Sequence, residues 1–344
     1  MGNGTFITEF VLLGFPEFHA IRMVFFAVVL LMYLISVSGN CLIITVVFME
    51  PKLHMPMYFF LSNFSLGELW TTTVIVPKML TNLALDQNTI CFTCCMAQIY
   101  IAFSVGATQF FNLTVMSFDR YTAICKPFLY NAKMTNRLCL SLALLTWFSG
   151  FTINFFQAIV VWAYPFCRHN VIDHFFCDAG PVFKLACVDT TLMELIGVLY
   201  GAIVMWGSFL FTLVSYACII TTIVRIPSVS GRSKAFSTCS SHLTVVGILY
   251  GASLFMYLRP STQSDTQTNK VLYFITVVVM PTITPFIFTI RNKDFKTAAI
   301  KLLNAMRQTP SFVFMTLTKQ QTPLKKRIPC SQKLCHHQRS CEKQ

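Results

Sequence analysis

Charged residues are scarce in this chain, and acidic residues are the scarcest of them. Only 11% of the 344 residues are charged, and 13 of these are acidic against 26 that are basic. A soluble domain carries roughly 25% charged residues, so this shortage excludes an ordinary soluble fold. Hydrophobic residues make up 55% of the chain, and the mean hydropathy is +0.63. These values indicate a protein that crosses a membrane several times.

The sequence also lacks the marks of several classes of membrane protein. There is no internal repeat, and Glu68 is the only clear acid in the middle of an apolar stretch. A transporter or channel, the main alternative class, needs a repeat or several ionisable groups along a path. Cys239 and His242 stand three residues apart, but at the end of a stretch, which does not suit an intramembrane enzyme. We therefore expect no enzymatic activity and no cofactor.

Seven apolar stretches of about 20 residues or more indicate membrane-spanning helices. They lie near residues 24–48, 57–82, 92–122, 139–163, 193–224, 236–258 and 270–290. Polar residues and prolines dilute the second and seventh stretches, and prolines such as Pro77 and Pro285 are tolerable only where neighbouring helices cover the freed backbone groups. The sequence therefore predicts an all-α fold, a seven-transmembrane helix bundle over residues 24–290.

Basic residues divide unevenly between the two sides of the predicted bundle. If residues 1–23 form an extracellular tail, most lysines and arginines between the spans fall on the cytoplasmic side, together with the basic C-terminal tail. This is the positive-inside arrangement. Attraction to an anionic inner leaflet explains the net charge of +13. We therefore expect the lipid bilayer, and no nucleic acid, as a partner.

A long loop at about residues 164–191 holds three cysteines on the extracellular side. Cys167, Cys177 and Cys187 lie in this loop, and Cys95 stands at the outer end of the third stretch. Four cysteines in an oxidising compartment indicate two disulfides, and their spacing leaves three connectivities open. His174 and Asp178 flank Cys177 as in a small metal cluster, but a metal ligand must be a thiolate. We expect disulfides here and no metal.

The chain after the seventh stretch changes character twice. Residues 291–308 place apolar side chains at helical spacing between lysines and arginines, which predicts an amphipathic helix on the membrane surface. Residues 309–344 are basic and polar, and we expect a disordered cytoplasmic tail. Zinc binding or palmitoylation of the tail cysteines is the alternative. At the other end of the chain, Asn3 begins an acceptor pattern for glycosylation.

An adjacent acid and arginine, Asp119 and Arg120, stand at the end of the third stretch. A charged pair is tolerable there only where a helix leaves the bilayer or faces other protein. This placement predicts a control point at the cytoplasmic end of a membrane helix.

Several motifs occur in collinear order between residue 1 and about residue 307. They are Pro51–Leu61 (PKLHMPMYFFL), Met116–Cys125 (MSFDRYTAIC), Ser215–Tyr216, Lys234–Leu243 (KAFSTCSSHL), Tyr250–Gly251, Phe255–Pro260 (FMYLRP), and Pro285 with Arg291–Asn292. With seven spans, this set resembles the vertebrate class II (tetrapod-type) olfactory receptors of the rhodopsin-like G-protein-coupled receptor family.

The resemblance implies a function and a disulfide pattern. Family members bind small volatile odorants at the plasma membrane and activate a heterotrimeric stimulatory olfactory G protein, which raises cyclic AMP. By the same resemblance, Cys95 pairs with Cys177, and Cys167 pairs with Cys187. A chemoreceptor outside the nose, or a receptor that no longer signals, keeps the same fold and is the alternative.

Family analogy places the odorant among the outer halves of spans three, five and six. The small residues expected to leave room on span three share one face. The expected ligand-binding residues are Ala102, Phe103, Gly106, Ala107, Val204, Tyr250, Ser253, Leu254 and Tyr257. A mostly apolar site with a few hydroxyls suits small neutral ligands. Ordinary packing of the bundle is the alternative for each position.

The resemblance also implies a switch in which Asp119 holds Arg120 in the resting state. The residues expected to take part are Asp119, Arg120, Tyr121, Tyr216, Lys234, His242, Thr284 and Phe288. Three positions depart from the family pattern: Thr284 and Phe288 stand where Asn and Tyr are usual, and Glu68 where Asp is common. A threonine offers one hydroxyl and a phenylalanine no polar atom. We therefore expect a weaker polar network in the inner half of this bundle.

Overall fold

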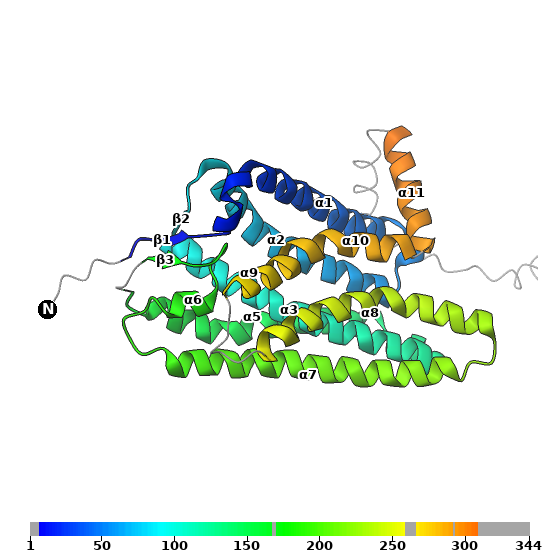
Figure 1. Ribbon diagram of the computed structural model, residues 1–344. Helices are drawn as coiled ribbons and strands as arrows, with labels where there is room; N and C mark the ends of the chain where they lie inside the picture. Colours follow the sequence, from blue (N-terminus) through cyan, green and yellow to red (C-terminus); the bar gives the residue numbers. More distant parts are fainter. Residues whose placement is uncertain (1–6, 167–169, 259–265, 292, 309–344) are drawn as a thin grey trace, which may run out of the picture. The chain divides into compact units, whose positions relative to one another are not determined.

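The computed structural model describes residues 7–166, 170–258, 266–291 and 293–308. Long helices dominate this part of the chain and lie side by side (Figure 1). Six of them are α1 (Arg22–Met49), α2 (Pro56–Leu85), α3 (Phe92–Cys125), α5 (Asn136–Ala163), α7 (Thr191–Val224) and α8 (Val229–Leu258). The seventh is built from α9 (Thr266–Phe274), the π-helix η4 (Ile275–Val279) and α10 (Met280–Arg291).

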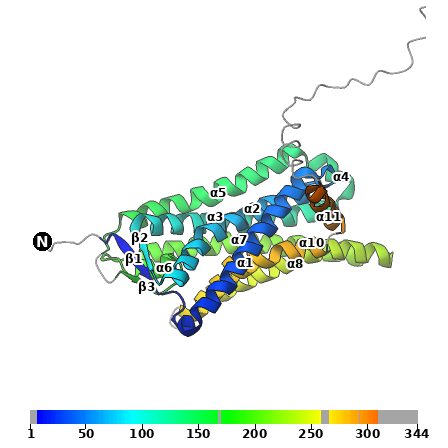
Figure 2. The ribbon, with the colours of Figure 1, turned by 90° about the horizontal axis from the view of Figure 1, so that it is seen from above.

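These helices confirm the predicted seven-helix bundle. Their ends lie close to the predicted ones, except that α8 begins at Val229 instead of near residue 236. In the part of the chain that the structure describes, six helices are long and apolar enough to cross a membrane. The 30-residue α2 is the exception, because polar residues such as Glu68 and Lys78 dilute it. It nevertheless packs along both α1 and α3 (Figure 2).

The prolines of the seventh span are covered as the sequence predicts. Pro285 has no N–H, so the carbonyl group of Pro281, four residues earlier, loses its helical partner. The side-chain amide of Asn40 on α1 donates to this carbonyl oxygen across 3.0 Å. Gly39 allows α1 to come this close, because a Cβ atom there would lie 2.8 Å from the ring of Pro285. A neighbouring helix thus replaces the missing hydrogen bond.

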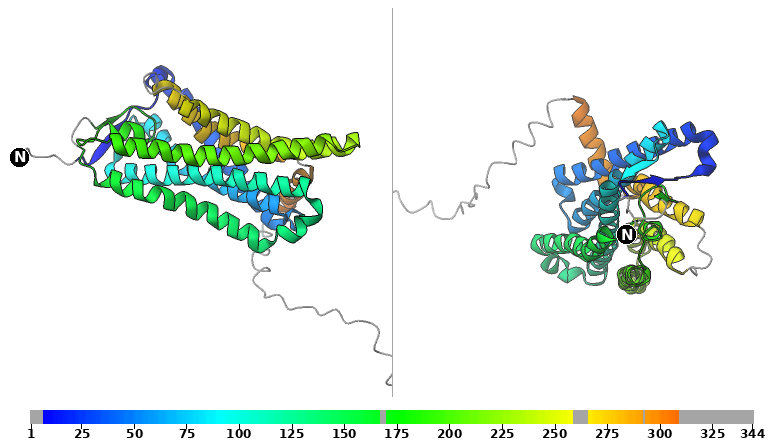
Figure 3. Two further views of the ribbon diagram at one scale, coloured as in Figure 1. Left: turned by 90° about the horizontal axis from the view of Figure 1, so that it is seen from below. Right: turned by 90° about the vertical axis from the view of Figure 1, so that its left-hand side faces the viewer.

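A small three-stranded sheet closes one end of the bundle, which we call the sheet end. Strand β1 (Glu9–Leu12) pairs antiparallel with β2 (Thr89–Cys91) and parallel with β3 (Val171–Ile172). The sequence did not predict these strands, because two to four residues are too few for a period of two to show. The right-hand view of Figure 3 looks along the helices from this end. The sheet fastens residues expected to form a tail onto the long loop.

Short elements complete the described chain. They are the 3-10 helices η1 (Pro16–Ile21) and η2 (Pro51–Leu53), and the helices α4 (Pro127–Lys133), α6 (Ala179–Phe183) and α11 (Lys293–Gln308). The helix α11 lies within the segment predicted to be amphipathic, and its apolar residues Phe295, Ala298 and Ala299 are buried. Asn3 and the tail at 309–344 lie outside the described residues.

The structure contains the disulfide expected between Cys95 and Cys177. Because both sulfurs are used in this bond, Cys177 is not a thiolate ligand for the metal cluster that the sequence pattern suggested. A second bond, between Cys91 and Cys94, was not predicted. Cys167 lies outside the described residues, so its pairing with Cys187 stays a prediction.

Candidate functional site

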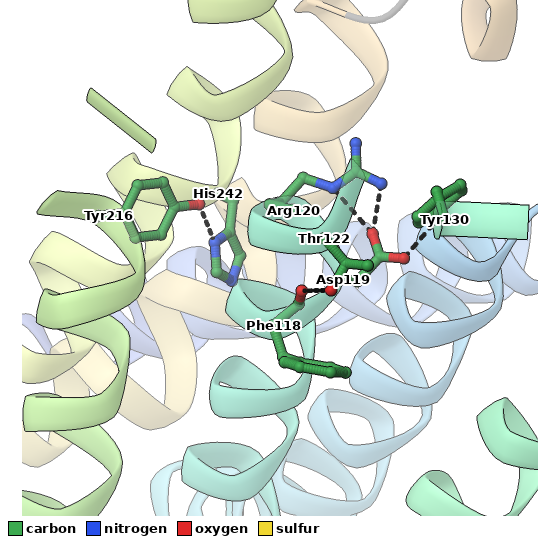
Figure 4. Close-up of polar contacts among 7 residues, drawn as sticks. All are labelled: Phe118, Asp119, Arg120, Thr122, Tyr130, Tyr216 and His242. Atoms are coloured by element: carbon green, nitrogen blue, oxygen red, sulfur yellow. Dashed lines mark hydrogen bonds and ion pairs between the residues drawn. The ribbon is translucent and has the colours of Figure 1, made fainter. Parts of the chain in front are cut away.

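The last turns of α3 carry a buried ion pair. Because α3 runs unbroken to Cys125, Asp119 and Arg120 lie at the end of the bundle opposite the sheet end. Asp119 is 1% exposed and Arg120 8%. The Nε atom of Arg120 donates to Oδ2 of Asp119 across 2.8 Å, and Nη2 contacts the same oxygen (Figure 4). The two side chains thus form an ion pair between adjacent residues of one helix.

A tyrosine that the sequence analysis did not single out completes this pair. Tyr130 lies on α4, and its hydroxyl group donates to Oδ1 of Asp119 across 2.8 Å. Burial, and then the negative charge of Asp119, raise the pKa of Tyr130. The Asp119 carboxylate therefore has a partner on each oxygen. The only signal in the sequence was the proline at 127, which begins a new helix directly after α3.

A second pair joins α7 to α8 at the same end. The hydroxyl group of Tyr216 is hydrogen-bonded to Nδ1 of His242, and the two rings stack with centroids 5.6 Å apart (Figure 4). Both side chains are buried, and Tyr216 lies in an apolar cluster with Ile219, Ile223 and Cys239. Tyr121 packs against this cluster from α3. The side chain of Lys234 lies outside the described part of the chain.

Thr284 and Phe288 occupy the inner part of α10, and both are buried. The hydroxyl group of Thr284 donates to Oε1 of Glu68 across 2.8 Å and lies 2.9 Å from the carbonyl oxygen of Met280. Thr284 therefore connects α10 to α2, and its hydroxyl bonds neither Asp119 nor Arg120.

Tyr250, one of the expected ligand-binding residues, contacts side chains of two other helices. Its hydroxyl group is hydrogen-bonded to Ser208 and lies 3.5 Å from that of Thr212, both on α7. Its ring contacts Phe110 of α3 and Phe209 of α7, with centroids 5.4 Å and 5.3 Å away. One tyrosine thus ties together the three helices on which family analogy places the odorant.

Gly106 on α3 is partly exposed and has open space beside it. A Cβ atom built at this position would meet no atom within 4 Å. The neighbouring Ala107, and Val204 of α7, are buried, whereas Ser253 and Leu254 on α8 are partly exposed. The side chain of Tyr257 lies outside the described residues.

Two of the expected residues on α3 pack in different directions. Ala102 packs against the cluster that holds Phe175 and Phe176 of the long loop, whereas Phe103 packs against the cluster around Cys95. The expected α3 residues therefore do not all face one site.

The structure also shows a cavity that the sequence analysis missed. It measures about 70 Å³ and lies at the sheet end, between the segment Leu13–Phe18, the start of α1 and the end of α2. Phe15, Phe175 and Asn82 are among its lining residues. Drug-sized ligand pockets are roughly 300–1,000 Å³, so this cavity accepts only a few heavy atoms. It lies far along the bundle from Tyr250 and is a poor candidate for the main ligand site.

A family model described as olfactory receptor matches residues 29–306. The chain belongs to the olfactory receptor family. Olfactory receptor 6X1 of Homo sapiens is 49% identical over 303 residues, which cover 88% of this receptor and 97% of that protein. Olfactory receptor 6T1 of Homo sapiens is 43% identical over 307 residues, or 89% and 95% of the two chains. Olfactory receptor 6E1 of Mus musculus is 43% identical over 297 residues, or 86% and 95%.

Family membership confirms the resemblance drawn from the motifs. It gives this receptor an odorant-receptor role as a multi-pass membrane protein, and it sets the receptor apart from enzymes.

Proposed function

We propose that this receptor binds a small, mostly apolar volatile inside the bundle and activates a stimulatory olfactory G protein, which raises cyclic AMP. In this proposal the N-terminus is extracellular, and the C-terminus faces the cytoplasm beneath the plasma membrane. The sheet end is then the extracellular end, and Arg120 lies at the cytoplasmic end.

The unbroken helix α3 carries this proposal. It holds open space at Gly106 and the buried pair at Asp119 and Arg120. At a rise of about 1.5 Å per residue, the two points are about 20 Å apart on one rigid element. A displacement of α3 caused by a ligand near Gly106 is therefore felt at Arg120.

The ligand contacts follow from the residues around this space. Phe110 and Tyr250 offer aromatic surface, Val204 and Ala107 offer apolar surface, and Ser208 and Tyr250 offer hydroxyl groups. Such a lining suits a small neutral molecule with one polar group. Ser253 and Leu254 complete the site from α8, and Ala102 and Phe103 bound it toward the long loop.

The switch rests on the two pairs at the cytoplasmic end. A movement of α8 away from α7 breaks the contact between His242 and Tyr216 and opens a cleft beside α3. Arg120 then releases the carboxylate of Asp119 and donates hydrogen bonds to the G protein instead, because the guanidinium group is a strong fork-shaped donor. Tyr121 borders the cleft, and Thr284 and Phe288 fix the resting position of α10.

A cyclic-AMP reporter assay with an odorant panel tests this function. We expect the wild type to respond to at least one volatile and the Arg120→Ala variant to lose that response at equal surface expression. Gly106→Val fills the open space and should raise the half-maximal concentration about tenfold, which corresponds to about 1.4 kcal/mol. Gly207→Val is the matched control, because Gly207 also has no neighbour within 4 Å but is exposed on α7. Equal effects of the two valines would contradict the proposed ligand site.

A further inference from the structure

The loop segment Ile172–Asp178, which we call the loop lid, is fastened over the sheet end of the bundle. Cys177 is bonded to Cys95, and its backbone N–H donates to Oε1 of Gln98 across 2.9 Å. Phe175 and Phe176 are buried in a cluster with residues of α2 and η4. The lid is thus held to α3 by covalent and polar bonds and to its other neighbours by apolar contacts.

Lys270 on α9 makes one further contact with the loop lid. Its side chain is 0% exposed, and its Nζ atom lies 2.6 Å from Oδ1 of Asp173. An ammonium group has three donors, and among the described residues this is the single hydrogen bond given by Lys270. In contrast to Lys270, the side chain of Asp173 is 49% exposed. A fully buried cation is therefore paired with a carboxylate that can turn out into solvent.

His174, the next residue of the lid, is a second buried donor with unused capacity. The backbone N–H of Phe176 donates to its Nδ1 atom across 3.5 Å, so in the neutral ring the proton is on Nε2. Burial, and then the charge of Lys270, lower the pKa of His174 to about 3, so the ring is neutral at pH 7. The Nε2 atom is buried without a hydrogen-bond partner among the described residues. An unmade hydrogen bond of this kind costs about 1–3 kcal/mol.

The other acid of the lid does not serve these donors. The carboxylate of Asp178 accepts from the Tyr273 hydroxyl group and from the backbone N–H groups of Ala179 and Gly180. Among the described residues, the buried Lys270 has only the half-exposed Asp173 as an acceptor, and Nε2 of the buried His174 has none. Aromatic surface adjoins them, since the ring of Tyr273 contacts His174 at 5.3 Å between centroids.

We propose that Lys270, with His174, is a recognition site for an organic carboxylate that carries an apolar tail. The ligand carboxylate takes the place of Asp173 on the ammonium group, Asp173 turns into solvent, and the tail packs on the aromatic rings of the lid. This site deepens the proposed function, since it names carboxylic acids as a ligand class of the receptor. It lies at the mouth of the bundle and is separate from the residues around Tyr250.

Chemical rescue of the purified full-length receptor tests the site without any signalling. Asp173→Ala leaves the Lys270 ammonium unpaired and should lower the thermal midpoint. Sodium acetate should then restore about half or more of the loss in a saturable way, because binding to the native state stabilises it. Acetamide and sodium chloride at equal concentration should not. Acetate should have no effect on the Asp173→Ala, Lys270→Met double variant.

The ion pair between Arg22 and Asp86 provides the matched control. It spans 2.7 Å, but both side chains are more exposed than Lys270. Asp86→Ala should therefore show no acetate rescue. The site is refuted if acetate fails to stabilise Asp173→Ala, or if it stabilises the double variant or Asp86→Ala equally.

A cyclic-AMP assay then asks whether ligands use the site. We expect straight-chain carboxylic acids to activate the wild type at lower concentration than the alcohols of equal length. Lys270→Met should lose this preference and keep the response to alcohols. Equal potency of acids and alcohols on the wild type would overturn the ligand class. A wild type that responds to no volatile counts against the proposed function, while acetate rescue still decides the chemistry of Lys270.

Discussion

The hydroxyl group of Thr284 donates a 2.8 Å hydrogen bond to the carboxylate of Glu68, and this bond joins the seventh span to the second. Both side chains are buried, and the other carboxylate oxygen of Glu68 is buried without a hydrogen-bond partner among the described residues. The hydroxyl group of Thr284 therefore supplies a hydrogen-bond donor that this acid cannot find in lipid. The two departures at Glu68 and Thr284 form one contact.

Thr284→Val should destabilise the receptor, because it keeps the shape of the side chain and removes the donor to Glu68. The expected cost is about 1–3 kcal/mol, seen as a lower thermal midpoint of the purified receptor. Thr289→Val is the matched control, because the Thr289 hydroxyl bonds the carbonyl of Pro285 within its own helix. Equal losses for the two variants would show that the bond to Glu68 contributes nothing particular.

The Thr284→Asn, Phe288→Tyr double variant tests the weaker polar network expected from the sequence. It adds an amide and a hydroxyl group to the inner half of α10. We expect a higher odorant-stimulated cyclic-AMP maximum, because these groups give α10 further partners when the helices rearrange. Basal and stimulated curves that coincide with the wild type at matched surface expression would end this hypothesis.

Tyr130→Phe should raise basal signalling. The change removes the 2.8 Å bond to Asp119 and leaves that carboxylate held by Arg120 alone. A loss of about 1 kcal/mol from the resting state shifts the ratio of resting to active receptor about fivefold. Ligand-free cyclic AMP is the measurement. Tyr33→Phe on α1 is the control, and a rise of the same size in that variant would argue against a specific role for Tyr130.

The two disulfides should differ in importance. The bond between Cys95 and Cys177 spans 82 positions, whereas that between Cys91 and Cys94 spans 3. In the chain-entropy model, closing these loops stabilises the fold by about 4.5 and about 1.6 kcal/mol. We expect the Cys95→Ser, Cys177→Ser receptor to fail to reach the cell surface, and the Cys91→Ser, Cys94→Ser receptor to reach it. Surface staining of the intact cells decides, and equal loss for both pairs would contradict the ranking.

Asp178 should make receptor stability depend on pH. Burial raises its pKa from 3.8 to about 6 in the folded receptor. Between these two pH values the folded state binds the proton more tightly than the unfolded state. The contribution of Asp178 to the free energy of unfolding therefore falls as the pH rises through about 6. The wild type should therefore have a higher thermal midpoint at pH 5 than at pH 7.5. In the Asp178→Asn variant this difference should be smaller by about 2–4 °C.

Asp189→Asn is the control for this pH dependence. The exposed Asp189 carboxylate accepts from the hydroxyl group of Thr191 and from its backbone N–H, the latter across 2.9 Å, and these bonds hold the pKa of Asp189 below its usual value. Loss of the Asp189 carboxylate should leave the difference in thermal midpoint between pH 5 and pH 7.5 as it is in the wild type. A profile for Asp178→Asn that follows the wild type would refute the assignment.

Local and additive properties of the sequence predicted most of the fold. Apolar content along the chain is enough to locate a membrane span, so six predicted spans lie within a few residues of the observed helices, and only α8 starts clearly earlier. The motifs that hold Asp119, Arg120, Tyr216 and His242 lie at the ends of these apolar stretches, so the sequence also predicted that these residues lie near helix ends. The strands β1, β2 and β3 escaped prediction because each is too short to carry a periodic signal.

The sequence by itself determined that this protein is a seven-helix membrane receptor of the olfactory family, because hydropathy and motif order do not depend on contacts. Only the tertiary structure decided which side chains meet. The bonds from Thr284 to Glu68, from Tyr130 to Asp119, from Tyr216 to His242 and from Lys270 to Asp173 depend on how each helix is rotated and where a loop folds back. Those quantities are set by packing between segments far apart in the chain, and no local pattern encodes them.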